Sequence, residues 1–121
     1  MKETVKQQPK DSITITIEKN EYIIKFPNTG VFLDLEREKI RLSGGYQAQL
    51  MDTNSGFMAR MLGDAIATFT TLIPNLKSDL NVENIFETDI IFSKKLVKIY
   101  SQEFLPWYND WIAILQDIDV D

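Results

Sequence analysis

Residues 12–26 read Ser12-Ile13-Thr14-Ile15-Thr16-Ile17-Glu18-Lys19-Asn20-Glu21-Tyr22-Ile23-Ile24-Lys25-Phe26, and this stretch decides the fold. Apolar and polar residues alternate from Ile13 to Ile17, as they do in a β-strand that buries one face. A second β-prone run, Tyr22–Phe26, follows a polar segment in which Asn20 tolerates the left-handed backbone that a turn requires. The stretch therefore predicts a β-hairpin over residues 12–26.

Two helices are predicted next. Residues 31–42 follow a capping side chain, Asn28, and end before Ser43-Gly44-Gly45, a typical helix stop. Residues 58–73 place apolar side chains three and four positions apart, which is the period of a helix with one buried face. Pro74 ends this second helix, because proline disfavours helical geometry in the residue before it.

The connecting segments are less regular. Residues 46–51 fit either a short helix or a strand, and the pattern does not decide between them. Residues 75–88 form a turn-rich connection with one or two short helical turns. The apolar residues of this connection are expected to pack against the core: Leu76, Leu80, Val82, Ile85 and Phe86.

A long helix is predicted from Thr88 or Asp89 up to Pro106. Its apolar positions keep the helical period: Phe92, Leu96, Ile99, Tyr100 and Phe104. Pro106 is expected to break this helix, because proline has no N–H and clashes with the preceding turn. Since proline suits the first position of a helix, residues 107–116 are expected to restart as a second segment, kinked against the first.

The 121 residues suffice for one hydrophobic core. We expect an α+β fold, with a single, mostly helical domain over residues 12–121. The hairpin occupies residues 12–26 of it, and a helical body of three or four helices occupies residues 29–117. Residues 1–11 are polar and lack periodicity, so we expect them to form a flexible arm.

Composition argues against most enzyme chemistry. The chain has neither cysteine nor histidine, and so lacks thiolate nucleophiles, the commonest general base and the commonest transition-metal ligands. Asp64 and Asp79 have no carboxylate partner identifiable by spacing, so a carboxylate-pair hydrolase has no support. Arg60 and Asp64 lie four residues apart, in the weaker orientation for an ion pair. The acidic residues Asp34, Glu36 and Glu38 diverge on a helix, which indicates a solvated face. We therefore expect a protein that is not an enzyme, with no catalytic residue, cofactor or metal.

The distribution of charged residues along the chain limits the classes of partner that we expect. Residues 1–41 hold 8 basic and 7 acidic side chains, whereas residues 42–121 hold 5 basic and 11 acidic ones. Nucleic-acid binding needs a basic face, so no nucleic-acid partner is expected. The sequence has no stretch that approaches a membrane span and no signal-peptide core at its start. We expect no membrane partner and no secretion.

An aromatic block is the densest feature of the chain. It places Phe104, Trp107, Tyr108 and Trp111 at helical spacing. Such a block on a small domain more often belongs to the core than to a contact surface. Tryptophan and tyrosine are nevertheless the usual anchors of protein interfaces, so the four residues are candidate interaction residues.

The hairpin isoleucines could likewise belong to the core or to a contact surface. Its face of Ile13, Ile15 and Ile17 needs a cover of helices, because two strands alone are marginally stable in water. The outer strand edges are open to a strand from a partner or from a second copy. Alternatively, charged residues such as Glu18, Lys19 and Lys25 guard these edges.

The order of elements resembles that of small assembly and virion proteins of tailed bacteriophages. The resemblance rests on Tyr22–Pro27 running into the helix at Leu35-Glu36, on Leu72–Lys77 and on Phe104–Trp107. Tail assembly chaperones are similar in having an N-terminal β-hairpin ahead of a helical domain. The resemblance implies a non-enzymatic protein of the host cytoplasm or the virion. It would bind other phage structural or assembly proteins and itself, as a transient scaffold or a permanent component.

The acidic C-terminal part supports a second hypothesis. Glu103, Asp110, Asp117, Asp119 and Asp121 lie in a stretch of 21 residues without lysine or arginine. A small acidic intracellular inhibitor or adaptor that binds a basic host protein would present carboxylates in this way.

Overall fold

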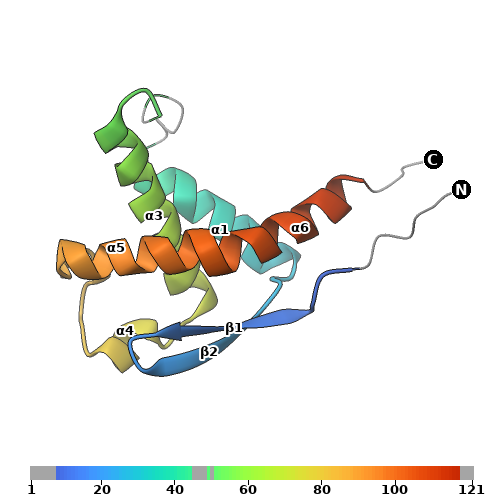
Figure 1. The fold of residues 1–121 in the computed structure, drawn as a ribbon, viewed down its shortest axis with the longest axis horizontal. Helices are drawn as coiled ribbons and strands as arrows, with labels where there is room; N and C mark the ends of the chain where they lie inside the picture. Colours follow the sequence, from blue (N-terminus) through green and yellow to red (C-terminus); the bar gives the residue numbers. More distant parts are fainter. Residues whose placement is uncertain (1–7, 45–48, 50, 118–121) are drawn as a thin grey trace, which may run out of the picture.

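The computed structural model describes residues 8–44, 49 and 51–117. A two-stranded hairpin lies along one side of the molecule, and the helices pack above it (Figure 1). The predicted α+β fold is therefore confirmed. Residues 46–48 and 50 of the undecided segment lie outside the described residues.

The hairpin consists of β1 (Ser12–Ile17) and β2 (Asn20–Lys25), which pair antiparallel with Ile15 opposite Tyr22. The connecting turn is shorter than predicted, since Asn20 already belongs to β2. Glu18 adopts the left-handed backbone in its place, with a φ of 57°. A two-residue loop that reverses the chain needs a positive φ at its centre, and Glu18 occupies that position.

Helices α1 (Thr29–Leu42) and α3 (Asn54–Leu72) pack against each other. Both helices begin earlier than predicted, because each starts immediately after a residue whose side chain caps its first turn. The Asn28 side chain accepts a hydrogen bond from the Val31 N–H at 2.9 Å, and Thr53 accepts one from Gly56 at the same distance. The stop after α1 is as predicted, with Gly44 at a φ of 64°.

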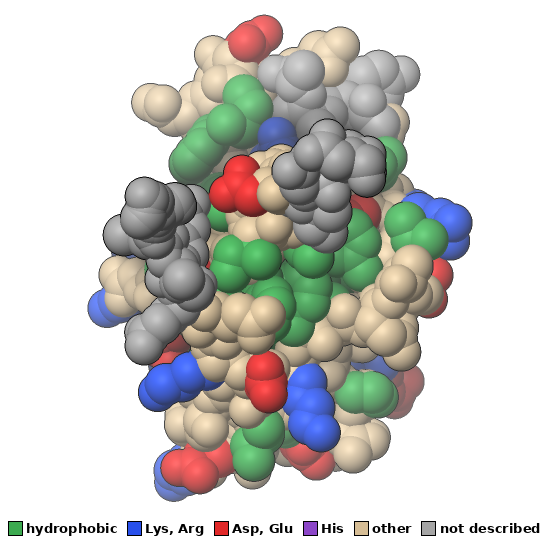
Figure 2. All heavy atoms as spheres, turned by 90° about the vertical axis from the view of Figure 1, so that its right-hand side faces the viewer, with side chains coloured by type: hydrophobic (Ala, Val, Ile, Leu, Met, Phe, Trp, Pro, Cys, Tyr) green, Lys and Arg blue, Asp and Glu red, His purple; other side chains and the backbone are tan. Residues whose placement is uncertain are grey.

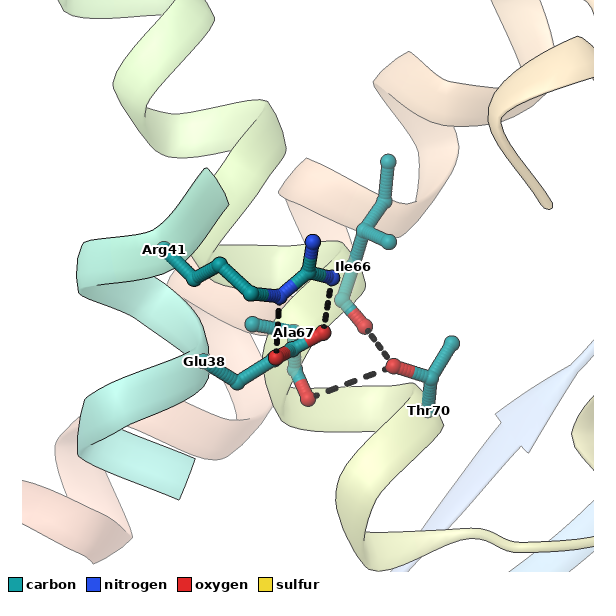
Figure 3. Close-up of polar contacts among 5 residues, drawn as sticks. All are labelled: Glu38, Arg41, Ile66, Ala67 and Thr70. Atoms are coloured by element: carbon teal, nitrogen blue, oxygen red, sulfur yellow. Dashed lines mark hydrogen bonds and ion pairs between the residues drawn. The ribbon is translucent and has the colours of Figure 1, made fainter. Parts of the chain in front are cut away.

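A close-up of the α1–α3 contact shows two kinds of polar interaction (Figure 3). On α1, the Arg41 guanidinium binds both carboxylate oxygens of Glu38. On α3, the Thr70 hydroxyl donates to the carbonyl of Ile66 at 2.7 Å. These contacts stay within one helix each, so they do not join α1 to α3.

The predicted connection contains α4 (Leu76–Leu80) and a 3₁₀ turn, Ile85–Glu87. Leu76 and Ile85 are buried as expected, and Leu80 and Val82 are partly buried. The prediction for Phe86 is wrong, because its side chain is 56% exposed. Successive residues of a 3₁₀ turn point about 120° apart, so burial of Ile85 turns Phe86 outward.

Pro106 does not break the last helix. Helix α5 (Ile90–Ile99) continues through a π-helical segment, Tyr100–Phe104, into α6 (Leu105–Gln116), and Figure 1 shows a continuous ribbon. The N–H of Leu105 donates to the carbonyl of Tyr100, five residues back. The wider π turn accommodates proline, which would clash with the carbonyl four residues before it in a regular helix. The predicted break is wrong for this reason, whereas the predicted second segment, angled against the first and with Pro106 in its first turn, is confirmed as α6 (Figure 1).

One core lies between the hairpin and the helices. Its largest fully buried members come from every layer: Phe69, Phe104, Ile15, Ile17, Leu35, Leu76 and Leu96. Within the described part of the chain, the helices are too short or too polar for any of them to cross a lipid bilayer.

Candidate interaction surfaces

The structure places most of the aromatic block in the protein's own core. Phe104, Trp107 and Tyr108 are buried, and Trp111 is half-buried. Three of these four candidate residues are therefore not displayed on the surface of this chain. Their helical spacing places these residues on one side of the helix, and that side packs against the hairpin.

Phe26, directly after β2, is the centre of the aromatic packing. Its ring lies 5.3 Å from Tyr108, 5.3 Å from Trp111 and 5.9 Å from Trp107, measured between ring centroids. Phe32 of α1 adds a further stacked contact at 6.4 Å. Such pairs stabilise beyond the burial of their area, so this cluster joins the hairpin, α1 and α6.

Both tryptophans also hold the segment before β1. The indole N–H groups of Trp107 and Trp111 donate to the same acceptor, the Lys10 carbonyl, at 2.6 and 3.0 Å. The carbonyl of Asp11 accepts a hydrogen bond from the Phe26 N–H at 3.2 Å. Of the arm expected at residues 1–11, Lys10 and Asp11 are thus fixed to the domain, and residues 1–7 lie outside the described residues.

The hairpin isoleucines are covered by the helices, as the sequence required. Ile15 and Ile17 are buried and Ile13 is half-buried. On the opposite face Ile23 is 73% exposed. The described sheet contains two strands, so neither outer edge is paired with a third strand of that part of the chain.

The end of the molecule that carries α6 and the N-terminal segment has an apolar centre (Figure 2). Figure 2 shows hydrophobic side chains gathered there, with acidic and basic side chains around them. The residues of the Phe26 cluster that remain partly exposed are Phe26, Phe32 and Trp111, and Leu115 of α6 is exposed. This end is the outer margin of the core.

A polar cluster lies between α1, α3 and α6. One carboxylate oxygen of Glu36 accepts hydrogen bonds from the Lys39 ammonium at 3.0 Å and the Tyr108 hydroxyl at 3.1 Å. The buried carboxylate of Asp64 lies 3.5 Å from the Arg60 guanidinium. Asp64 and Glu36 each have a basic partner about one turn away on their own helix, and the Tyr108 hydroxyl is a partner of Glu36 that sequence spacing does not indicate.

Burial shifts the protonation of this cluster. It raises the pKa of Asp64, although the positive charges of Lys39 and Arg60 oppose the shift. Burial also raises the pKa of Tyr100, and the negative charge of Asp64 adds to the effect. For Tyr108, burial and then Glu36 raise the pKa in the same way. The two tyrosines are therefore neutral at physiological pH, and the Tyr108 hydroxyl donates to Glu36.

The cluster has the character of an internal bonding network. Glu36 and Asp64 each have basic or hydroxyl partners, and neither faces a cavity among those found in the described part of the chain. No group of three or more side chains suited to a metal ion occurs among residues 8–44, 49 and 51–117. The arrangement fixes α6 to α1 and orients the aromatic rings.

A second exposed apolar surface lies between the N-terminal half of α3 and the start of α5. A hollow of about 150 Å³ is lined by Met58, Leu62, Ile90, Ile91 and Lys94. An adjoining hollow of about 270 Å³ shares Leu62 and Ile90 with it and extends to Phe86. We call these two hollows the α3–α5 groove.

The walls of the α3–α5 groove protrude into solvent. Ile90 is 65% exposed and Ile91 is 62% exposed, and Phe57 and Met58 of α3 are exposed nearby along the chain. Large apolar side chains that gather on one surface mark sites where another molecule covers them. The groove is thus the part of the described surface best suited to protein binding.

The sequence analysis did not single out this groove, although a signal was present. The predicted stripe of the long helix uses Phe92, Leu96 and Ile99, which leaves Ile90 and Ile91 off the buried face. Apolar residues outside a helix's core stripe are candidates for a second, external contact. The partnership of α3 with α5 is a tertiary feature that no local pattern contains.

Searches of protein-family models, curated proteins and solved structures gave no match to this chain.

Proposed function

We propose that this chain is a non-enzymatic protein that acts by binding other proteins during assembly of a phage particle. In this role it is either a tail assembly chaperone or a small structural component of the virion. The phage setting rests on the order of elements, a hairpin ahead of a helical body, which tail assembly chaperones share. The mode of action rests on the surface.

The observation that carries the proposal is the exposure of Phe86, Ile90 and Ile91 along the α3–α5 groove. Leaving such side chains in water forgoes the gain of burying them, about 1.5–3 kcal/mol for each side chain. A partner that covers the groove recovers this free energy. Binding, and not chemistry, is the function that such a surface supports.

The test is co-expression of the chain with the tail and head proteins encoded beside its own gene. We expect at least one of them to co-elute with the chain in size-exclusion chromatography with light scattering. Ile90→Asp should abolish that co-elution, whereas Ile23→Asp, on the exposed face of β2, should leave it unchanged. Failure of every neighbouring phage protein to bind would refute the proposal.

A second candidate, an acidic inhibitor or adaptor of a basic protein, is favoured by the outer face of α6. Asp110 in α6 and Asp117 at its end are exposed and lie seven residues apart, which places them on one side of the helix. For this candidate, neutralising both residues should weaken binding to the basic partner and reduce its salt dependence. An unchanged salt dependence would leave the groove as the binding surface.

A further inference from the structure

We propose that the α3–α5 groove binds a second copy of this chain in a symmetric pair whose α5 helices run antiparallel. The inference rests on the proposed function, since it names a partner for the same surface. Its basis is a match of shape and charge between the surface and a rotated copy of itself.

The surface offers both protruding side chains and a hollow. Ile90 and Ile91 protrude at the start of α5, and the hollow beside them is lined by Met58 and Leu62 of α3. A two-fold axis near Ile91 carries the protruding side chains of each copy toward the hollow of the other. Interfaces of this type use the same patch on both subunits, so one patch must supply both knob and hole.

The charges around Ile90 and Ile91 are divided along the chain, with acidic residues before the isoleucines and basic residues after them. Glu87 and Asp89 precede them, and Lys94, Lys95 and Lys98 follow them, all with exposed side chains. None of these five side chains forms an ion pair with another described residue. Asp89 caps α5 by accepting a hydrogen bond from the Ile91 N–H at 2.6 Å, so the charges available to a partner are those of Glu87 and the three lysines.

Only one orientation of two α5 helices satisfies these charges. A parallel pair would bring acid beside acid and base beside base, which is unfavourable. An antiparallel pair brings the acidic start of each helix to the basic continuation of the other. Lys94 lines the groove, three residues after Ile91 on the same side of α5, so its charge lies at the rim of the buried apolar contact.

The first test is the mass of the full chain at increasing concentration, by sedimentation equilibrium. We expect a monomer–dimer equilibrium whose dissociation constant rises at least about tenfold in Ile91→Asp, since a charge would enter the apolar centre. Ile23→Asp is the matched control, because Ile23 is at least as exposed as Ile91 but lies on the hairpin. A monomer at every concentration, or a dimer insensitive to Ile91→Asp, overturns the inference.

The second test exchanges charges. Glu87→Lys and Lys94→Glu should each weaken self-association about tenfold, because each variant faces like charges in its own homodimer. An equimolar mixture of the two variants should regain a dimer, since each lysine then meets a glutamate. Circular dichroism confirms that both variants fold. Absence of dimer in the mixture, with both variants folded, refutes the antiparallel arrangement.

The two proposals fail separately. A dimer with these properties that binds no phage protein would sustain the inference and refute the proposed function. A strict monomer that binds a tail or head protein through the groove would support the proposed function and refute the inference of a symmetric pair.

Discussion

The indole N–H of Trp107 donates to the carbonyl of Lys10 at 2.6 Å across 97 positions of sequence. Trp111 donates to the same carbonyl, so two side chains of α6 hold one peptide group in front of β1. Phe26 packs edge-to-face against Trp107 and tilted against Trp111, which places this contact beside the aromatic cluster. The first described residues and the last helix thus stabilise each other.

We expect Trp107→Phe to lower the free energy of unfolding by about 1–2 kcal/mol, since it removes the shorter of the two hydrogen bonds and part of the packed ring. Trp111→Phe should cost less, because its bond is longer and its side chain more exposed. Urea unfolding measures both effects. In the double variant, amide exchange of residues 8–13 should accelerate; unchanged exchange would show that the indoles do not hold this segment.

Asp64→Asn should change how stability depends on pH. Because burial raises the pKa of Asp64 in the folded protein, its contribution is fully present below the ordinary value of about 3.9 and is lost as pH rises through the folded value. The wild type should therefore lose stability relative to the variant over this acidic range. Urea unfolding at several pH values provides the comparison.

Glu38→Gln is the control of opposite sign for that experiment. The hydrogen bond from Arg41 lowers the pKa of Glu38, so its contribution is present above the ordinary value and is lost as pH falls through the folded value. The wild type should gain stability relative to this variant as pH rises. Slopes of the same sign in both variants would contradict the assignment.

Tyr100→Phe should reduce the loss of stability in alkali. Burial raises the pKa of the Tyr100 hydroxyl, so the unfolded chain releases this proton near pH 10 while the folded protein retains it. The contribution is present below about pH 10 and is lost above it. Tyrosinate absorbance should show one residue fewer titrating late in the variant. Simultaneous titration of all tyrosines in the folded wild type would disprove this account.

Glu18→Gly should stabilise the protein by about 1 kcal/mol, because Glu18 adopts the left-handed backbone at a cost that glycine does not incur. Lys19→Gly is the matched control, since Lys19 has no positive φ and the added flexibility should destabilise. Thermal unfolding of both variants distinguishes the two directions. Equal effects would show that the turn is not strained at Glu18.

Local patterns predicted the hairpin and the main helices, because alternation, caps and stops act within a few residues. The predictions failed where a tertiary contact or an unusual backbone conformation determines the local structure. Glu18, and not Asn20, adopts the left-handed backbone because the strand register fixes the loop at two residues. A π-helical turn accommodates Pro106, a rare solution that no composition rule indicates.

The candidate surface was predicted less well than the fold. Sequence spacing showed that the aromatic block has one face, but not whether that face meets the hairpin or the solvent. Phe26 decides this question, because its ring lies among those of α6. The α3–α5 groove depends on how two helices distant in sequence cross, which the stripe of either helix does not reveal.

The hydrogen bonds from Trp107 and Trp111 to the Lys10 carbonyl also constrain the order in which the domain folds during synthesis. The hairpin is synthesised long before α6, so its aromatic partner is missing while the middle helices emerge. Contacts that join distant positions must await closure of the whole loop between them. In the nascent chain, Lys10 and Phe26 therefore lack their aromatic partners until α6 is made, and during that interval the exposed Phe26 ring is a binding site for a ribosome-associated chaperone.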